Sequence, residues 1–100
     1  MEKTKAEIIK ALKRHKRGVS REYLAAVTGK SDRVNRQAIA DLRLEGAMIG
    51  TTRSGGYSLN NKKDFERTMA FYKAKTRNEE KMLRRMQRTM ESEGQIAFDV

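Results

Sequence analysis

The chain contains no cysteine and no proline among its 100 residues. Without cysteine it can form neither a disulfide framework nor a thiolate zinc site. The lack of proline is typical of a mostly helical chain, because proline interrupts helices. No run of residues approaches the roughly 20 consecutive apolar positions that a membrane-spanning helix needs, and no signal peptide is visible. We therefore expect a cytoplasmic protein with no membrane partner.

Positive charge dominates the residues that are present. The 23 lysines and arginines outnumber the 13 acidic residues, which gives a formal net charge of +10, and 37% of the residues are hydrophobic. This length suits one small domain with an appendage. A modest core beneath a strongly basic surface favours polyanionic partners, with nucleic acid ahead of an anionic membrane.

The sequence shows no arrangement of residues that is typical of an enzyme. It has no nucleophile–base–acid set, no phosphate loop and no paired carboxylates in a context that would form a pocket. His15 is the only histidine, and it has no carboxylate at ligand spacing, so we expect a polar surface residue. We expect no catalytic residues, no metal and no cofactor.

The pattern between residues 20 and 59 predicts two short helices followed by a two-stranded hairpin. Ser20 is a good N-cap for the first helix, and Gly29 can supply the left-handed residue that ends it. Ser31 or Asp32 caps the second helix, whose apolar residues recur with helical spacing at Val34, Ala38, Ile39 and Leu42. Gly46 ends that helix. Residues 48–52 and 57–59 then have the pattern of short strands, with residues 53–56 as the tip between them.

These segments resemble the winged-helix DNA-binding domain of the biotin-repressor type. The resemblance covers about half the chain, and the matching residues are Gly29, Lys30, Ser31, Ile39, Leu42, Arg43, Gly46 and residues 55–59. It implies a mainly α fold with a small β-hairpin wing, a winged helix-turn-helix over residues 1–61 that a long C-terminal helix follows. Asn35 stands where that family usually has an apolar core residue, so we expect Val34 to take the inward place. No chain is left for the catalytic domain of the biotin repressor, so the resemblance implies nothing about biotin.

The motif places two groups of polar residues where they can contact double-stranded DNA. Arginine can pair with guanine through two hydrogen bonds, and asparagine or glutamine can pair with adenine in the same way. A wing tip reaches a minor groove or flanking phosphates. The candidate contacts are Ser31, Arg33, Asn35, Arg36 and Gln37 in the second helix, and Arg53 and Ser54 in the wing. The alternative is that these residues are only the solvated side of an amphipathic helix and ordinary turn residues.

The segment before this motif predicts one more helix and a short strand. Thr4 and Glu7 have the spacing of a capping box at a helix start, and Ile8, Ile9 and Leu12 form its apolar stripe. The basic run at residues 13–17 suits a helix end, where it either contacts phosphates or is solvated. We expect residue 19 to form a short strand that joins the wing sheet.

A long basic helix is predicted over residues 62–93, with Asn60 and Asn61 as its cap. A heptad seam runs along it at Phe65, Met69, Tyr72, Thr76, Glu79, Leu83, Met86 and Met90. Its outer part has nothing of its own chain left to bury against, so the sequence predicts a coiled-coil homodimer through Leu83, Met86 and Met90. The alternative is a solvent-exposed or frayed helix.

Residues 94–100 are expected to form an extended tail. Gln95 followed by Ile96 and Phe98 resembles the short peptide by which bacterial replication and repair proteins bind the sliding clamp. A tail that folds back on the protein would have the same sequence pattern.

Three functional hypotheses follow from these features. The first is a sequence-preferring double-stranded DNA-binding protein, dimeric, acting in transcription regulation in a bacterium, phage or mobile element. The second is a DNA-replication accessory protein whose tail binds the sliding clamp. The third is a winged-helix adaptor that binds other proteins.

Overall fold

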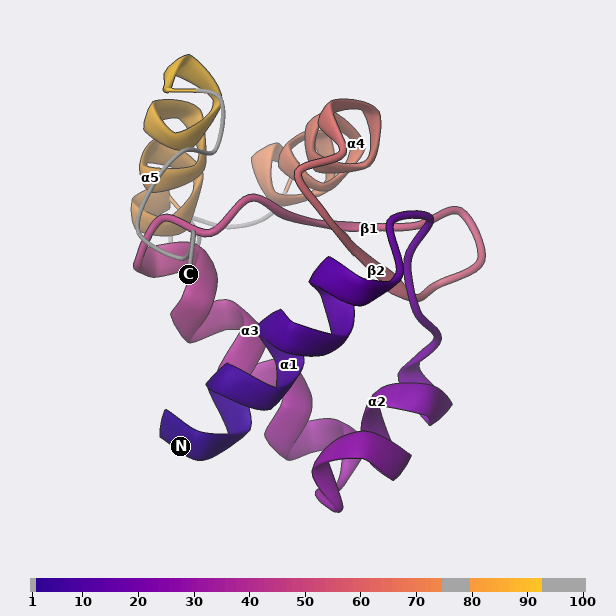
Figure 1. Ribbon diagram of the computed structural model, residues 1–100. Coiled ribbons are helices and arrows are strands. Elements are labelled where there is room, and N and C mark those ends of the chain that lie inside the picture. The colour runs from indigo at the N-terminus through magenta and orange to yellow at the C-terminus, as the bar shows by residue number, and fades with distance from the viewer. Residues whose placement is uncertain (1, 75–79, 93–100) are drawn as a thin grey trace.

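The computed structural model describes residues 2–74 and 80–92, which are mainly helical (Figure 1). Three helices are followed by an antiparallel hairpin and then by two more helices. The elements are α1 (Glu2–Arg14), α2 (Arg21–Thr28), α3 (Asp32–Leu44), β1 (Ile49–Thr51), β2 (Tyr57–Leu59), α4 (Lys62–Lys73) and α5 (Glu80–Glu91). The predicted mainly α fold class is confirmed, and the first five elements are compatible with a winged helix. Within the described residues, no helix combines the length and the apolar character needed to cross a membrane.

Short polar side chains begin the helices, as the sequence indicates. The Ser20 hydroxyl accepts a hydrogen bond from the Tyr23 amide at 3.0 Å, and the Ser31 hydroxyl accepts one from the Val34 amide at 3.2 Å. Ser31, and not Asp32, is therefore the N-cap of α3. The predicted capping box at Thr4 is wrong, because α1 already includes residue 2 and Thr4 is buried within it.

A two-stranded sheet, extended by one bridging residue, forms the hairpin. Thr51 of β1 pairs with Tyr57 of β2, and Val19 bridges to the other side of Tyr57 through two backbone hydrogen bonds of 2.8 and 2.9 Å. The strand-like contact predicted for residue 19 is confirmed. A Cβ atom on Gly56 would lie 2.0 Å from the Val19 carbonyl oxygen, so this close approach requires glycine.

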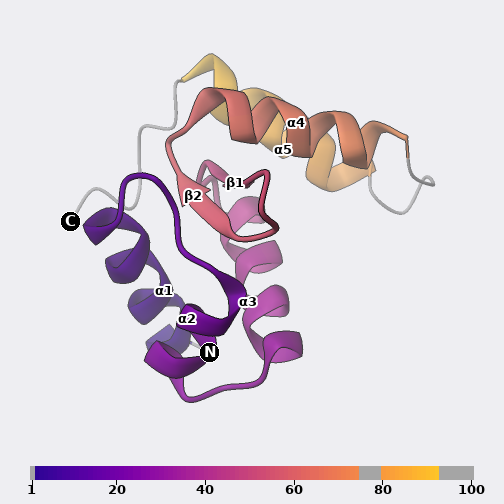
Figure 2. The ribbon, with the colours of Figure 1, turned by 90° about the vertical axis from the view of Figure 1, so that its right-hand side faces the viewer.

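The main core lies where α1, α2 and α3 meet beneath the hairpin (Figure 2). Helices α1 and α3 contribute several buried apolar residues and α2 contributes Leu24, although Val34 of the predicted α3 stripe is exposed, and the hairpin covers one end. Its fully buried side chains include Ile8, Leu12, Leu24, Ile39, Leu42 and Ile49. This packing fixes α3 along one side of the molecule.

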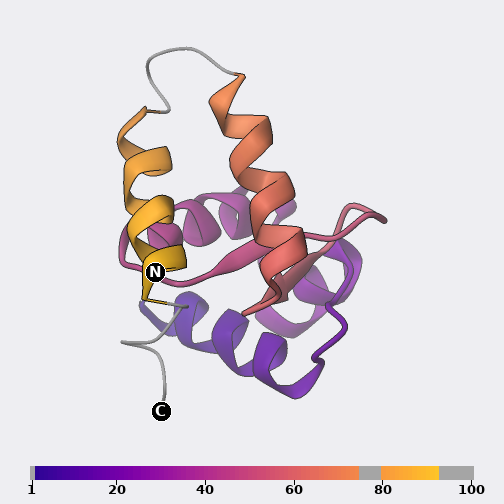
Figure 3. The same ribbon diagram turned by 90° about the horizontal axis from the view of Figure 1, so that it is seen from above.

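The predicted single helix over residues 62–93 is instead two helices that lie side by side (Figure 3). Most of the described seam residues face their own chain: Met86 of α5 is 0% exposed and packs with Met48 and Phe65, and Met69, Tyr72 and Met90 pack against this cluster. The inference that a partner helix must cover Met86 is therefore wrong. A heptad repeat indicates that one side of a helix is apolar, but it does not indicate whether the same chain or a partner chain covers that side.

Helix α5 packs on the C-terminal end of α3. The Arg85 guanidinium donates to the carbonyl oxygens of Leu44 and Glu45, each at 3.2 Å, and the Thr89 hydroxyl lies 3.4 Å from the Gly46 carbonyl oxygen. These carbonyls have no partner within α3, and they carry the negative end of its dipole. Arg85 therefore provides hydrogen-bond donors for carbonyl groups at the C-terminal end of α3, and its positive charge complements the negative end of the helix dipole.

Met86→Ala should lower the free energy of unfolding by about 2–5 kcal/mol, because it removes a fully buried side chain and leaves a cavity. Urea unfolding followed by circular dichroism measures the change. Gln87→Ala is the matched control, since residue 87 is exposed on the same helix and should change stability by no more than about 0.5 kcal/mol. Equal stability of the two variants would contradict the described core.

Candidate nucleic-acid interface

The N-terminal half of α3 presents most of its predicted DNA-contacting residues to solvent. Arg33 and Gln37 lie one helical turn apart on the side opposite the core, and Arg36 lies on the flank of α3 that also carries its ion-pair partner Asp32. Ser31 is exposed, although its hydroxyl already caps the helix. These four residues are exposed to a partner, although Gln37 Nε2 donates to Asp41 Oδ1 at 3.1 Å.

Asn35 is not available, because it is only 2% exposed. It shares the core side of α3 with Ala38, Ile39 and Leu42, which follow it at three, four and seven residues. Val34, which was expected to point inward, is 36% exposed instead. Both expectations are wrong for the same reason: helical spacing from the apolar residues selects position 35, although its side chain is polar.

A hydrogen-bond network compensates for the burial of Asn35. The Thr28 hydroxyl lies 3.0 Å from Asn35 Oδ1 and 3.0 Å from the Leu24 carbonyl oxygen, and it accepts from the Lys30 amide at 3.1 Å. A hydroxyl has one proton, and Asn35 Nδ2 has no partner in this orientation. An amide turned so that Nδ2 faces Thr28 would donate to the hydroxyl, which then donates to Leu24. The network ties the end of α2 to the start of α3.

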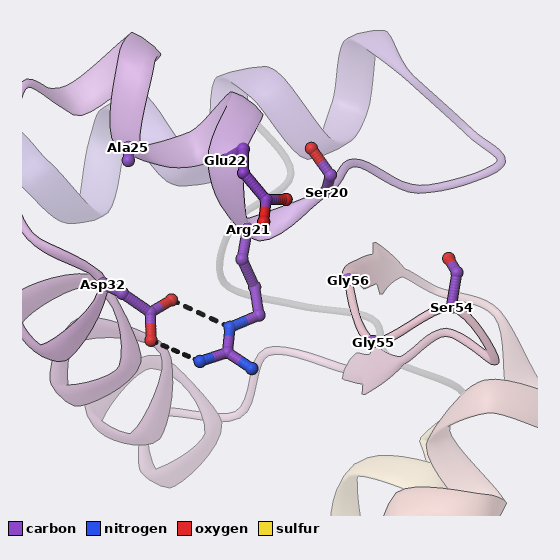
Figure 4. A pocket seen from close by; sticks show the side chains of 8 residues that line it. All are labelled: Ser20, Arg21, Glu22, Ala25, Asp32, Ser54, Gly55 and Gly56. Carbon is purple, nitrogen blue, oxygen red and sulfur yellow. Dashed lines mark hydrogen bonds and ion pairs between the residues drawn. The ribbon is translucent and has the colours of Figure 1, made fainter.

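Arg21, which the sequence did not identify, joins α2 to α3 at this surface. Its Nε donates to Asp32 Oδ1 at 2.9 Å and its Nη2 donates to Oδ2 (Figure 4). Arg36 Nε lies 3.1 Å from the same Oδ2. The hydrogen bonds from Arg21 lower the pKa of Asp32. The Ser20 cap marks residue 21 as the start of α2, and this was the one available signal for its position.

A surface depression of about 410 Å³ lies between the starts of α2 and α3 and the turn of the hairpin (Figure 4). Residues from three separate segments, which are α2, α3 and the hairpin turn, border this depression. The lining residues are Ser20, Arg21, Glu22, Ala25, Asp32, Ser54, Gly55 and Gly56. Arg53 is exposed at the same turn. Of the two predicted wing contacts, Ser54 thus lines a depression that it shares with Asp32 at the start of α3, and Arg53 is its neighbour in sequence.

The other predicted sites have different outcomes. Leu83 and Met90 are half-buried in α5, so a homodimer that uses them stays a prediction. Gln95, Ile96 and Phe98, the predicted clamp-binding residues, lie outside the described residues. His15 is exposed, with Nε2 3.1 Å from the Tyr23 hydroxyl, as expected of a polar surface residue. Over residues 2–74 and 80–92 no group of three histidine or carboxylate side chains could hold a metal.

Comparison with known proteins gives no relative: the chain matches no protein-family model, no curated protein and no solved structure.

Asn35→Ala should lower the free energy of unfolding by about 1–3 kcal/mol, because it breaks a buried hydrogen-bond network. Thr28→Val removes the other partner, so the double variant should lose less than the sum of the two single losses. Urea unfolding of the four proteins measures this coupling. Strictly additive losses would mean that the two side chains act independently.

The Asp32 ion pairs should make stability depend on pH. Arg21 lowers the pKa of Asp32, so the folded chain holds the carboxylate ionised at a pH where the unfolded chain protonates it. The resulting stabilisation is fully present above the unfolded pKa of about 3.9 and is lost as the pH falls through the lower folded value. The difference in melting temperature between the wild type and Asp32→Asn should therefore shrink from pH 6 to pH 3. An unchanged difference would show that charge is not its cause.

Proposed function

We propose that this chain is a sequence-preferring double-stranded DNA-binding protein that acts as a small transcriptional regulator. The observation that supports this most is the surface shared by the starts of α2 and α3 and the hairpin turn, which Arg21 lines. Three further exposed arginines belong to the same elements: Arg33 and Arg36 near the start of α3, and Arg53, the neighbour of Ser54 in the turn. The net charge of +10 acts in the same direction, because it attracts a polyanion from a distance.

Helix α3 is suited to a major groove. Its 13 residues span about 20 Å, and its core side packs against α1, α2, β1 and α5, so its outer side can enter a groove without disturbing the fold. Arg33 and Gln37 stand at the centre of that outer side. An arginine pairs best with guanine and a glutamine with adenine, so these two residues can read base edges.

The hairpin turn and α2 supply contacts of a different kind. Arg53 extends from the turn between β1 and β2, and Arg21 lies at the first position of α2. Contacts from such cations to phosphates fix the register of a protein on the duplex without reading sequence. The function therefore divides into base reading by α3 and backbone positioning by its two neighbours.

The triple variant of Arg33, Arg36 and Arg53 to alanine tests the proposal. The variant should weaken binding and flatten the slope of log K against log salt concentration, by about 0.9 for the lost phosphate contact of Arg53. Titration of a labelled duplex, recovered by selection from a random library, at several salt concentrations gives both quantities. Arg53→Ala alone should weaken all duplexes alike, whereas Arg33→Ala should also relax sequence preference.

A second triple variant, Lys3, Lys73 and Lys81 to alanine, is the matched control. It removes the same charge from exposed positions on α1, α4 and α5, outside α2, α3 and the hairpin turn. It should retain most of the affinity and all of the sequence preference. Equal losses of affinity in the two triple variants would mean that binding depends only on general charge attraction, and this would refute the proposed interface.

A further inference from the structure

We propose that Asp32 sets the sequence selectivity of this surface by positioning the guanidinium of Arg36, an inference that rests on the proposed DNA binding. An acidic residue at the centre of a polyanion-binding surface reduces attraction, so its presence requires a compensating role. Its contacts indicate that role: the carboxylate bonds Arg21 of α2 and Arg36 of α3 at the same time.

The contact between Asp32 and Arg36 does not use the terminal nitrogens of the Arg36 guanidinium, which are the atoms that can pair with a base. Asp32 Oδ2 lies 3.1 Å from Nε of Arg36, so the two terminal Nη nitrogens are not used by this ion pair. Those two nitrogens form the end of the guanidinium fork that can pair with guanine O6 and N7. The Arg36 side chain is 58% exposed, which leaves that end accessible. The carboxylate therefore restricts where the fork can lie without occupying it.

Arg21 holds the carboxylate itself in place. It binds Asp32 side-on through Nε and Nη2, and a paired contact of this kind fixes both distance and plane. Asp32 is further fixed by its backbone, because it is the first residue of α3 after the Ser31 cap. The chain of contacts from α2 through Asp32 to Arg36 thus orders a long side chain before DNA arrives, which reduces the entropy lost on binding.

The same carboxylate repels phosphates that approach without a matching base. It lines the depression with Arg21, so a phosphate entering there meets a negative charge as well as a positive one. Random sequence offers only phosphates, whereas a preferred sequence also offers Arg36 a base edge. Asp32 should therefore penalise unselected DNA more than selected DNA, and this difference is what determines specificity.

Asp32→Asn is the direct test, with affinity measured for the selected duplex and for a scrambled duplex of the same composition. The variant should bind the scrambled duplex more tightly, with a steeper salt dependence. The ratio of the two affinities should fall at least about 5-fold, which is the lower end of what one paired base contact discriminates. An unchanged ratio would overturn the proposal even if both affinities rise.

Glu22→Gln is the matched control, because Glu22 lines the same depression and the substitution removes the same charge. Among the described contacts of Arg21 and Arg36, its carboxylate is not a hydrogen-bond partner. This variant should raise both affinities and leave their ratio unchanged. A fall in the ratio equal to that of Asp32→Asn would make the effect one of local charge alone and would overturn the positioning role.

A double-mutant cycle separates Arg36 from the other partners of Asp32. In an Arg36→Ala background the Asp32→Asn substitution should no longer alter the affinity ratio, because the side chain that it positions is gone. The same fold-change in both backgrounds would overturn the proposal. If the wild-type chain enriches no duplex from the library, the proposed sequence-preferring DNA binding itself is refuted. If the wild type prefers the selected duplex and Asp32→Asn prefers it to the same degree, only the role of Asp32 is refuted.

Discussion

The position of α3 depends on one packing contact, the burial of Ile39 and Leu42 against α1 and α2. Both side chains are within 1% of full burial, and their partners include Ile8, Leu12 and Leu24. Burying a side chain of this size contributes about 1.5–3 kcal/mol, so a few such contacts account for most of the stability of a small domain. Because the core side of α3 is fixed in this way, its outer side is fixed as well.

Polar contacts hold the two ends of α3 by different means. At its start, the Thr28–Asn35 network and the Arg21–Asp32 pair join it to α2. Near its end, buried Arg43 donates to the Ile49 carbonyl oxygen at 2.7 Å and to the Tyr72 hydroxyl at 3.2 Å. Burial lowers the pKa of Arg43, but a guanidinium is so strongly basic that arginine side chains stay charged in proteins. The helix is therefore a rigid element that α1, α2, β1 and α4 all help to place.

Sequence reasoning mostly succeeded where a signal is local and failed where distant segments decide the outcome. The cap at Ser20 depends on neighbouring backbone amides, so residue type and spacing were enough to predict it, and they narrowed the other two caps to Ser31 or Asp32 and to Asn60 or Asn61. The capping box predicted at Thr4 is the local exception. The seam that includes Met86 gave the right apolar side but the wrong covering partner. That partner is Met48 with Phe65, 38 and 21 residues earlier by residue number, and helical periodicity carries no information about such a separation. Arg21 was missed for a similar reason, because its partner Asp32 lies in the next helix.

The burial of Met86 also bears on the order in which the chain can mature during translation. Residues 1–59 emerge from the ribosome first and contain the side chains of the main core. Met48 and Phe65 can be fully covered only after α5 has been synthesised, because Met86 completes the apolar cluster that these three residues form. Until that helix emerges, the nascent chain exposes apolar surface beside β1, and exposed surface of this kind is prone to association with other chains. A fragment from a ribosome that stalls before residue 86 would therefore be prone to aggregation.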